Sequence, residues 1–151
     1  MKVAIGTDHR GAETARTVAQ QLRLDGHAVN VVGEASGVAS DYPDSAWLVT
    51  REIVTGGADR GVLICGTGIG MAIAANKVEG IRAALALDEL SAQLSRSHND
   101  ANVLCLSADL LGHTLVRRII EVWMKTGFDG GRHARRLAKI TRIERREDPR
   151  T

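Results

Sequence analysis

The amino-acid sequence predicts an α/β fold, a single three-layer sandwich in which helices cover both faces of a parallel sheet. Short runs of aliphatic residues alternate with longer stretches of helical periodicity from one end of the 151-residue chain to the other. The strand-like runs are continuously apolar, as is typical of parallel strands that are buried on both faces. No repeat, linker or low-complexity segment divides the sequence, so residues 1–151 are predicted to form one domain.

Turn signals bound the elements of the first half of the chain. The first helical stretch places Val18, a leucine and several alanines on one face. A loop of polar and small residues leads to Tyr42-Pro43, and Gly56-Gly57 ends the next helical stretch. The predicted elements are, in order, a strand over 2–6, a helix over 13–24, a strand over 27–32, a helix over 45–55 and a strand over 60–65.

The second half of the chain continues the same alternation and ends in a basic helix. A glycine-rich loop follows the third predicted strand, and Gly130-Gly131 precedes the last helix, whose apolar stripe is Leu137, Ile140 and Ile143. The predicted elements are a helix over 70–77, a strand over 81–87, a helix over 91–97, a strand over 102–107, a helix over 114–126 and a C-terminal helix over about 132–146.

The composition excludes several classes of protein. Aromatic residues make up only 3% of the chain, so we expect an aliphatic core and no stacking platform for nucleic-acid bases. No apolar run approaches the roughly 20 residues of a membrane span. Cys65 and Cys105 lie in strand-like surroundings and are expected to be the reduced thiols of a cytoplasmic protein.

The net charge of +2 hides a basic C-terminal segment. Residues 132–151 hold eight Lys/Arg against three Asp/Glu, a local balance of +5, and the rest of the chain carries −3. This segment is either a solvated helix face or an anion-binding surface. Arg132 and Arg136 are four residues apart, so on a helix they share one face and together can hold a phosphate.

A cysteine stands directly before a glycine loop. Cys65 ends a predicted strand, and the loop that follows, Gly66-Thr67-Gly68-Ile69-Gly70, opens a helix. Backbone N–H groups in such a loop are free to bind an anion, and the spacing matches neither a dinucleotide-binding loop nor a Walker loop. A thiolate base beside N–H donors suits proton abstraction next to a carbonyl. The alternative for Cys65 is a small buried hydrophobic residue.

Two further polar groups are candidates for chemistry. Asp8 and His9 follow the first predicted strand, at the sheet edge where ligands of α/β proteins bind, although Asp8 could instead cap the next helix. The stretch SRSHNDAN, which contains His98 and Asn99, holds more polar side chains than capping requires. Histidine both gives and accepts protons near neutral pH. No His, Cys and Asp residues have metal-ligand spacing along the sequence, so neither a metal nor another cofactor is implied.

Taken together, these stretches resemble type B ribose-5-phosphate isomerase, of the ribose/galactose isomerase family of sugar-phosphate isomerases. The matching segments are IGTDHRG (5–11), DYPD (41–44), GVLICGTGIGMAIAANKVEGIRAAL (61–85), SAQLSRSHNDANVL (91–104) and GGRHARR (130–136). The resemblance implies a five-stranded parallel Rossmann-like sheet and a metal-free aldose–ketose isomerase. It also implies a homodimer or a dimer of dimers, with sites shared between subunits.

The resemblance implies a role for each candidate residue. Cys65 resembles the base that moves a proton between C2 and C1 of the sugar, and the loop from Gly66 to Gly70 resembles the hole for the enediolate. The other implied roles are a hydroxyl-proton relay for Thr67, ring opening for His98 with help from Asp8, a substrate-hydroxyl contact for Asn99, and phosphate contacts for His9, Arg132 and Arg136.

The turn after the fifth predicted strand departs from this family. Its members usually carry an arginine there, in a pattern such as GARVVG, whereas this chain reads SADLLG with Asp109 at that position. Asp109 either opposes a bound phosphate or pairs with a basic side chain, for example one from the C-terminal helix. An uncompensated like charge about 4 Å away costs roughly 4 kcal/mol at an effective dielectric of about 20, which favours the pair.

Three functions remain open from the sequence. The first is interconversion of ribose 5-phosphate and ribulose 5-phosphate, which belongs to the pentose phosphate pathway. The second is a related isomerisation of a hexose 6-phosphate or a less anionic sugar, as Asp109 suggests. The third is a non-catalytic module that binds a sugar phosphate or nucleic acid through the basic segment. Cys65 and His98 favour an enzyme, so we expect a small sugar phosphate, no nucleic acid and no membrane as partners.

Overall fold

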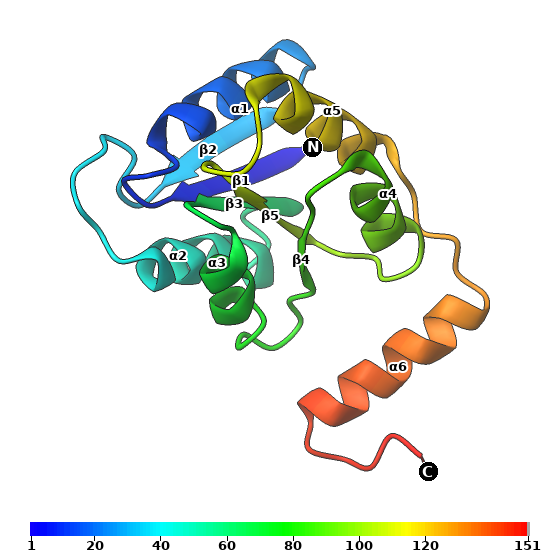
Figure 1. Cartoon of the computed structure of the whole chain (residues 1–151). Helices are drawn as coiled ribbons and strands as arrows, with labels where there is room; N and C mark the ends of the chain where they lie inside the picture. Colours follow the sequence, from blue (N-terminus) through cyan, green and yellow to red (C-terminus); the bar gives the residue numbers. More distant parts are fainter. Residues whose placement is uncertain (151) are drawn as a thin grey trace.

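A parallel sheet of five strands forms the centre of the molecule in the computed structural model, which describes residues 1–150 (Figure 1). The strand order is β2-β1-β3-β5-β4, and every neighbouring pair is parallel. The strands are β1 (Lys2–Thr7), β2 (Ala28–Val32), β3 (Arg60–Cys65), β4 (Ala83–Leu85) and β5 (Val103–Ser107).

Helices cover both faces of this sheet and bury two separate apolar layers. Helices α1 (Ala12–Leu24), α4 (Glu89–Ser97) and α5 (His113–Lys125) share one core with β1, β3 and β5, in which Trp123 is fully buried. Helices α2 (Tyr42–Val54) and α3 (Ile69–Ala75) form the second core on the other face. The predicted three-layer sandwich with a five-stranded parallel sheet is therefore confirmed (Figure 1).

Most predicted elements shift by one or two residues at their ends, and α2 and β4 differ most from the prediction. Helix α2 begins at Tyr42, three residues earlier than expected, because Pro43 is tolerated in the first turn of a helix. Strand β4 is shorter than the predicted 81–87, since it is an edge strand that pairs only with β5. Ile81 instead packs into the core shared with α2 and α3.

The strand order determines which loops meet at the carboxyl edge of the sheet. From β1 the chain moves outward to β2 and then returns to place β3 on the other side of β1. This reversal lies between β1 and β3, the point at which ligands bind in open α/β sheets. The loop after β1 and the loop after β3 are therefore neighbours, and the turn after β5 lies next to the β3 loop.

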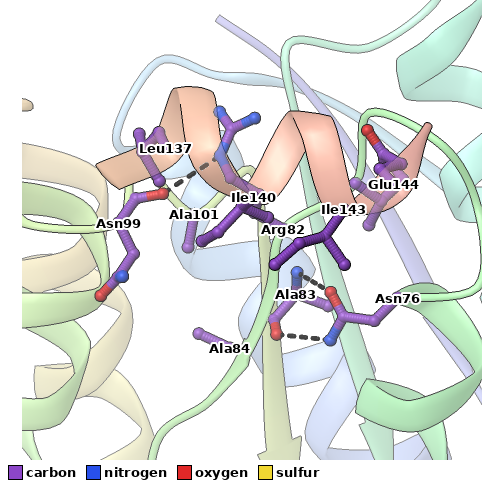
Figure 2. A pocket seen from close by; sticks show the side chains of 11 residues that line it. Asn76, Arg82, Ala83, Ala84, Asn99, Ala101, Leu137, Ile140, Ile143 and Glu144 are labelled. Carbon is purple, nitrogen blue, oxygen red and sulfur yellow. Dashed lines mark hydrogen bonds between the residues drawn. The ribbon is translucent and has the colours of Figure 1, made fainter. Parts of the chain in front are cut away.

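The last helix, α6 (Arg132–Glu144), stands apart from the sandwich (Figure 1). His133 is its only buried residue, and Ile140 and Ile143 are 45% and 58% exposed. Its apolar stripe faces a cavity of about 420 Å³ beside β4, which is lined from the other side by Asn76 and Ala83 (Figure 2). Within residues 1–150, no helix is long and apolar enough to cross a membrane.

Candidate active site

Cys65 lies at the end of β3, where the sheet meets the glycine loop. The residue is 5% exposed, and its Sγ accepts a hydrogen bond of 3.1 Å from the backbone N–H of Gly68. Gly68 adopts a left-handed conformation (φ = 77°), and a Cβ there would lie 2.5 Å from Leu85 Cδ1. The loop therefore needs glycine at this position to bring its backbone against the sulfur.

The other cysteine has a different environment. Cys105 lies in the middle of β5, is fully buried, and belongs to the core shared with α2 and α3. Burial is the main cause that raises the pKa of its thiol far above the ordinary value. Both cysteines are free thiols, and only Cys65 lies beside a loop of backbone N–H groups.

The loop after β1 adds a buried carboxylate to the same edge. Asp8 is 6% exposed, and its Oδ1 accepts backbone N–H bonds from Arg10 at 3.0 Å and Gly11 at 3.1 Å. Asp8 thus holds the turn before α1, beside the end of β3, but the N-cap of this helix is Gly11, so Asp8 is not its capping residue. His9 is exposed, and its Nδ1 accepts a bond of 3.5 Å from the backbone N–H of Ser40.

Asp109 forms an ion pair that crosses this edge. Its Oδ2 accepts hydrogen bonds from Arg10 Nε at 3.0 Å and Arg10 Nη2 at 2.7 Å. The expected basic partner is therefore present, but it comes from the loop after β1 and not from the C-terminal helix. Gly66 lies under the pair, since a Cβ there would be 2.8 Å from Asp109 Oδ2 and 2.9 Å from Arg10 Nε.

His98 lies in a second group of side chains with α6. It ends α4, and its ring stacks on His133 with centroids 4.1 Å apart and planes 8° from parallel. Burial lowers the pKa of His133, and the positive charges of His98, Arg132 and Arg136 add to this effect. His133 Nε2 accepts a contact of 3.4 Å from Arg132 Nε. The stack therefore places a buried ring, whose pKa is lowered, against His98.

The structure places the candidate residues at opposite edges of the sheet. Cys65 ends β3 opposite Ser107, the last residue of β5, whereas His98 and Asn99 precede the first residue of β5. The length of β5 alone separates these edges by about 13 Å. The carboxyl-edge group consists of Cys65, Asp8, His9 and the glycine loop. His98, Asn99, Arg132 and Arg136 form the amino-edge group.

Asn99 shows how the amino-edge group is held. Its backbone carbonyl accepts a bond of 3.1 Å from Arg82 Nε, and Arg82 Nη2 also donates to Asp100 Oδ2 at 2.9 Å (the first of these bonds is drawn in Figure 2). Asp100 in turn accepts a bond from the buried Arg96 at 2.8 Å. Asp100 has a positive φ of 44°, so this network holds the turn after α4 in a conformation that is uncommon for a residue with a side chain.

His98 and two neighbouring side chains could hold a metal ion. The ligand atoms of His98, Asp129 and His133 all lie within 4.8 Å of one another. Sequence spacing alone does not indicate this cluster, because His98 is remote from the other two along the chain.

The sequence did not predict Arg10 and His133 as site residues, although each is next to a predicted one, His9 and Arg132.

Comparisons with known proteins identify the family of this chain. Residues 3–140 match the family model described as Ribose/Galactose Isomerase. The chain is 42% identical to ribose-5-phosphate isomerase B of Escherichia coli, over 97% of this chain and 99% of that one. It is 39% identical to D-erythrulose-4-phosphate isomerase of Pectobacterium atrosepticum, over 97% of each.

A solved structure shows the same fold at similar identity. Ribose-5-phosphate isomerase B of Clostridium thermocellum superimposes with a TM-score of 0.95 at 44% identity, covering 97% of this chain and 99% of that one. Three findings indicate the same family: the family match over most of the chain, relatives at about this identity and the shared fold. The chain is an isomerase and belongs to the ribose/galactose isomerase family.

Proposed function

We propose that this isomerase interconverts ribose 5-phosphate and ribulose 5-phosphate through an enediolate, with Cys65 as the base and without a metal. The hydrogen bond from Gly68 N–H to Cys65 Sγ is the observation that carries the proposal. It shows the thiol in direct reach of loop N–H groups, which can hold the negative charge that develops on the sugar oxygens. The E. coli and C. thermocellum relatives named for this activity support the choice of substrate.

The proposed reaction begins on the open-chain aldose. The Cys65 thiolate removes the proton from C2, and the C2–H electrons form the C1–C2 double bond as the carbonyl oxygen becomes an oxyanion. The loop from Gly66 to Gly70 holds this oxyanion, and Thr67, which is exposed, relays protons between hydroxyl groups. Delivery of the proton from Cys65 to C1 then yields the ketose.

We further propose that each site is built from two copies of the chain. The two edge groups cannot meet within one chain, because the sheet lies between them. Helix α6 projects from its own sandwich and carries Arg132 and Arg136 with it (Figure 1). In a homodimer, the amino-edge group of one copy would face the carboxyl-edge group of the other.

We assign the remaining residues the roles that the family resemblance implies, divided between the two copies. From one copy, Asp8 assists ring opening and His9 contacts the phosphate. From the other copy, His98 opens the furanose ring by acid–base catalysis, Asn99 binds a sugar hydroxyl, and Arg132 and Arg136 bind the phosphate. A cytoplasmic enzyme of this kind would act in the pentose phosphate pathway.

A substrate panel tests the proposed function. We expect the highest kcat/KM for ribose 5-phosphate among pentose, tetrose and hexose phosphates and free sugars. The D-erythrulose-4-phosphate isomerase among the relatives makes a four-carbon phosphate the strongest competitor. A higher kcat/KM for a four- or six-carbon phosphate would remove ribose 5-phosphate as the natural substrate.

Removal of divalent ions is expected to leave the turnover unchanged. Loop N–H groups supply the charge stabilisation that a metal would otherwise provide, so no step of the proposed reaction requires an ion. The measurement is kcat before and after exhaustive dialysis against a chelator, with the metal content determined in both samples. A loss of activity that a divalent ion restores would contradict this, and the cluster of His98, Asp129 and His133 is where that ion would bind.

A further inference from the structure

We propose that Arg10, oriented by Asp109, binds the phosphate group of the substrate at the carboxyl edge. This inference rests on the proposed function, since it assigns one more residue to that sugar phosphate. It gives the carboxyl-edge group its own cation, in addition to the arginines that α6 of the other copy would bring. Under this proposal, the ion pair of Arg10 with Asp109 belongs to the substrate-binding site and is not an ordinary surface ion pair.

The first argument is position. Arg10 follows Asp8 and His9 at the end of β1, and Asp109 follows the end of β5, so the pair spans the end of β3 between them. Both side chains lie within 3 Å of the place where a Cβ on Gly66 would stand. Gly66 opens the loop that begins next to the Cys65 thiol. A guanidinium at this place lies at the same edge of the sheet as the proposed base.

The second argument is the supply of free donors. Asp109 Oδ2 takes the hydrogen bonds of both Nε and Nη2, so one side of the guanidinium is fixed. Nη1 makes no hydrogen bond to any of residues 1–150, and the Arg10 side chain is 56% exposed. The guanidinium thus has a defined orientation and still presents N–H groups outward. A planar cation with fixed donors is well suited to a phosphate monoester.

The third argument is charge. A carboxylate in the turn after β5 would repel a phosphate held by His9, but Asp109 is neutralised by the direct contact with Arg10. The family usually places an arginine at the position of Asp109. In this chain the cation is supplied from the opposite side of Gly66 instead. Exposed ion pairs contribute little to stability, so replacing Arg10 is expected to change binding and not folding.

Calorimetric titration with inorganic phosphate tests the inference directly, without depending on turnover. We expect Arg10→Gln to raise the Kd of phosphate by at least about tenfold, and Arg10→Lys to raise it less, because lysine keeps the charge but loses the fork. The matched control is Arg16→Gln, which removes the same charge from an exposed position on α1. In kinetics, Arg10→Gln should raise KM for ribose 5-phosphate in parallel with this Kd, with a much smaller change in kcat.

A double variant that places the cation on the other side of Gly66 completes the experiment. In the Arg10→Gln background, Asp109→Arg restores a cation from the β5 side, and we expect phosphate affinity to return. Binding by Arg10→Gln that equals binding by the Arg16→Gln control would overturn the inference. A wild-type protein that binds phosphate through Arg10 but does not isomerise ribose 5-phosphate would instead remove the proposed substrate and leave the role of Arg10 intact.

Discussion

Cys65→Ala is expected to lower kcat for isomerisation by about 10²–10⁴-fold, because the change removes the proposed base of the proton transfer. The thiol is small and lies at the end of a strand, so the fold should persist and KM should change little. The measurement is kcat and KM for ribose 5-phosphate, together with exchange of the C2 proton with solvent. A variant that keeps more than about a tenth of the wild-type kcat would rule out Cys65 as the base.

The second cysteine provides the matched control for this substitution. Cys105→Ala makes the same chemical change within a fully buried strand that carries no candidate side chain of the site. It should lower thermal stability, because it leaves a small cavity in the core, while kcat is retained. Loss of activity in both variants would show that thiol removal acts through the fold, and the assignment of Cys65 would then fail.

Mixing two inactive variants is expected to restore activity. Cys65→Ala damages the carboxyl-edge group, and His98→Asn damages the amino-edge group. In a mixed dimer, one site combines the two intact edges. Random reassociation makes half of the dimers mixed with one intact site each, so about a quarter of the wild-type activity should return. The measurement is turnover before and after the two variants are unfolded together and refolded.

The control for this experiment uses two variants of the same edge. Mixed dimers of Cys65→Ala and Asp8→Asn contain no site with an intact carboxyl edge, so they should stay inactive. If the Cys65→Ala and His98→Asn mixture also stays inactive, each site must be complete within a single chain. The proposal of sites shared between subunits would then be wrong.

Much of the fold could be predicted because its signals are local. Continuous apolar strands predicted a buried parallel sheet, and the rule for carboxyl ends of strands predicted that Asp8 and Cys65 lie at one edge. The edge position of β4 could not be predicted, since strand order depends on contacts between segments remote in sequence. The pairing of Arg10 with Asp109 depends on the same order, because it requires β1, β3 and β5 to be neighbours.

The candidate site illustrates a different limit. The polar stretch around His98 predicts that this residue belongs to a site. The sequence does not show at which edge of the sheet each candidate residue lies. The parallel register of β3 and β5 shows that His98 and Cys65 lie at opposite edges of the sheet. The stack of His98 on His133 likewise depends on where the segment between α5 and α6 turns, which Gly130 and Gly131 permit through positive φ angles.

The projection of α6 from the sandwich links the specific activity of the enzyme to its concentration. Helix α6 buries only His133 against its own chain, and in the proposed homodimer another copy would cover Ile140 and Ile143. If that copy also completes the site, dilution removes catalytic sites as it separates the copies. Activity per milligram would then fall with decreasing protein concentration below the dissociation constant of the dimer, and substrate that occupies the shared site would slow that loss. Expression level would therefore control not only the number of enzyme molecules but also the fraction of them that work.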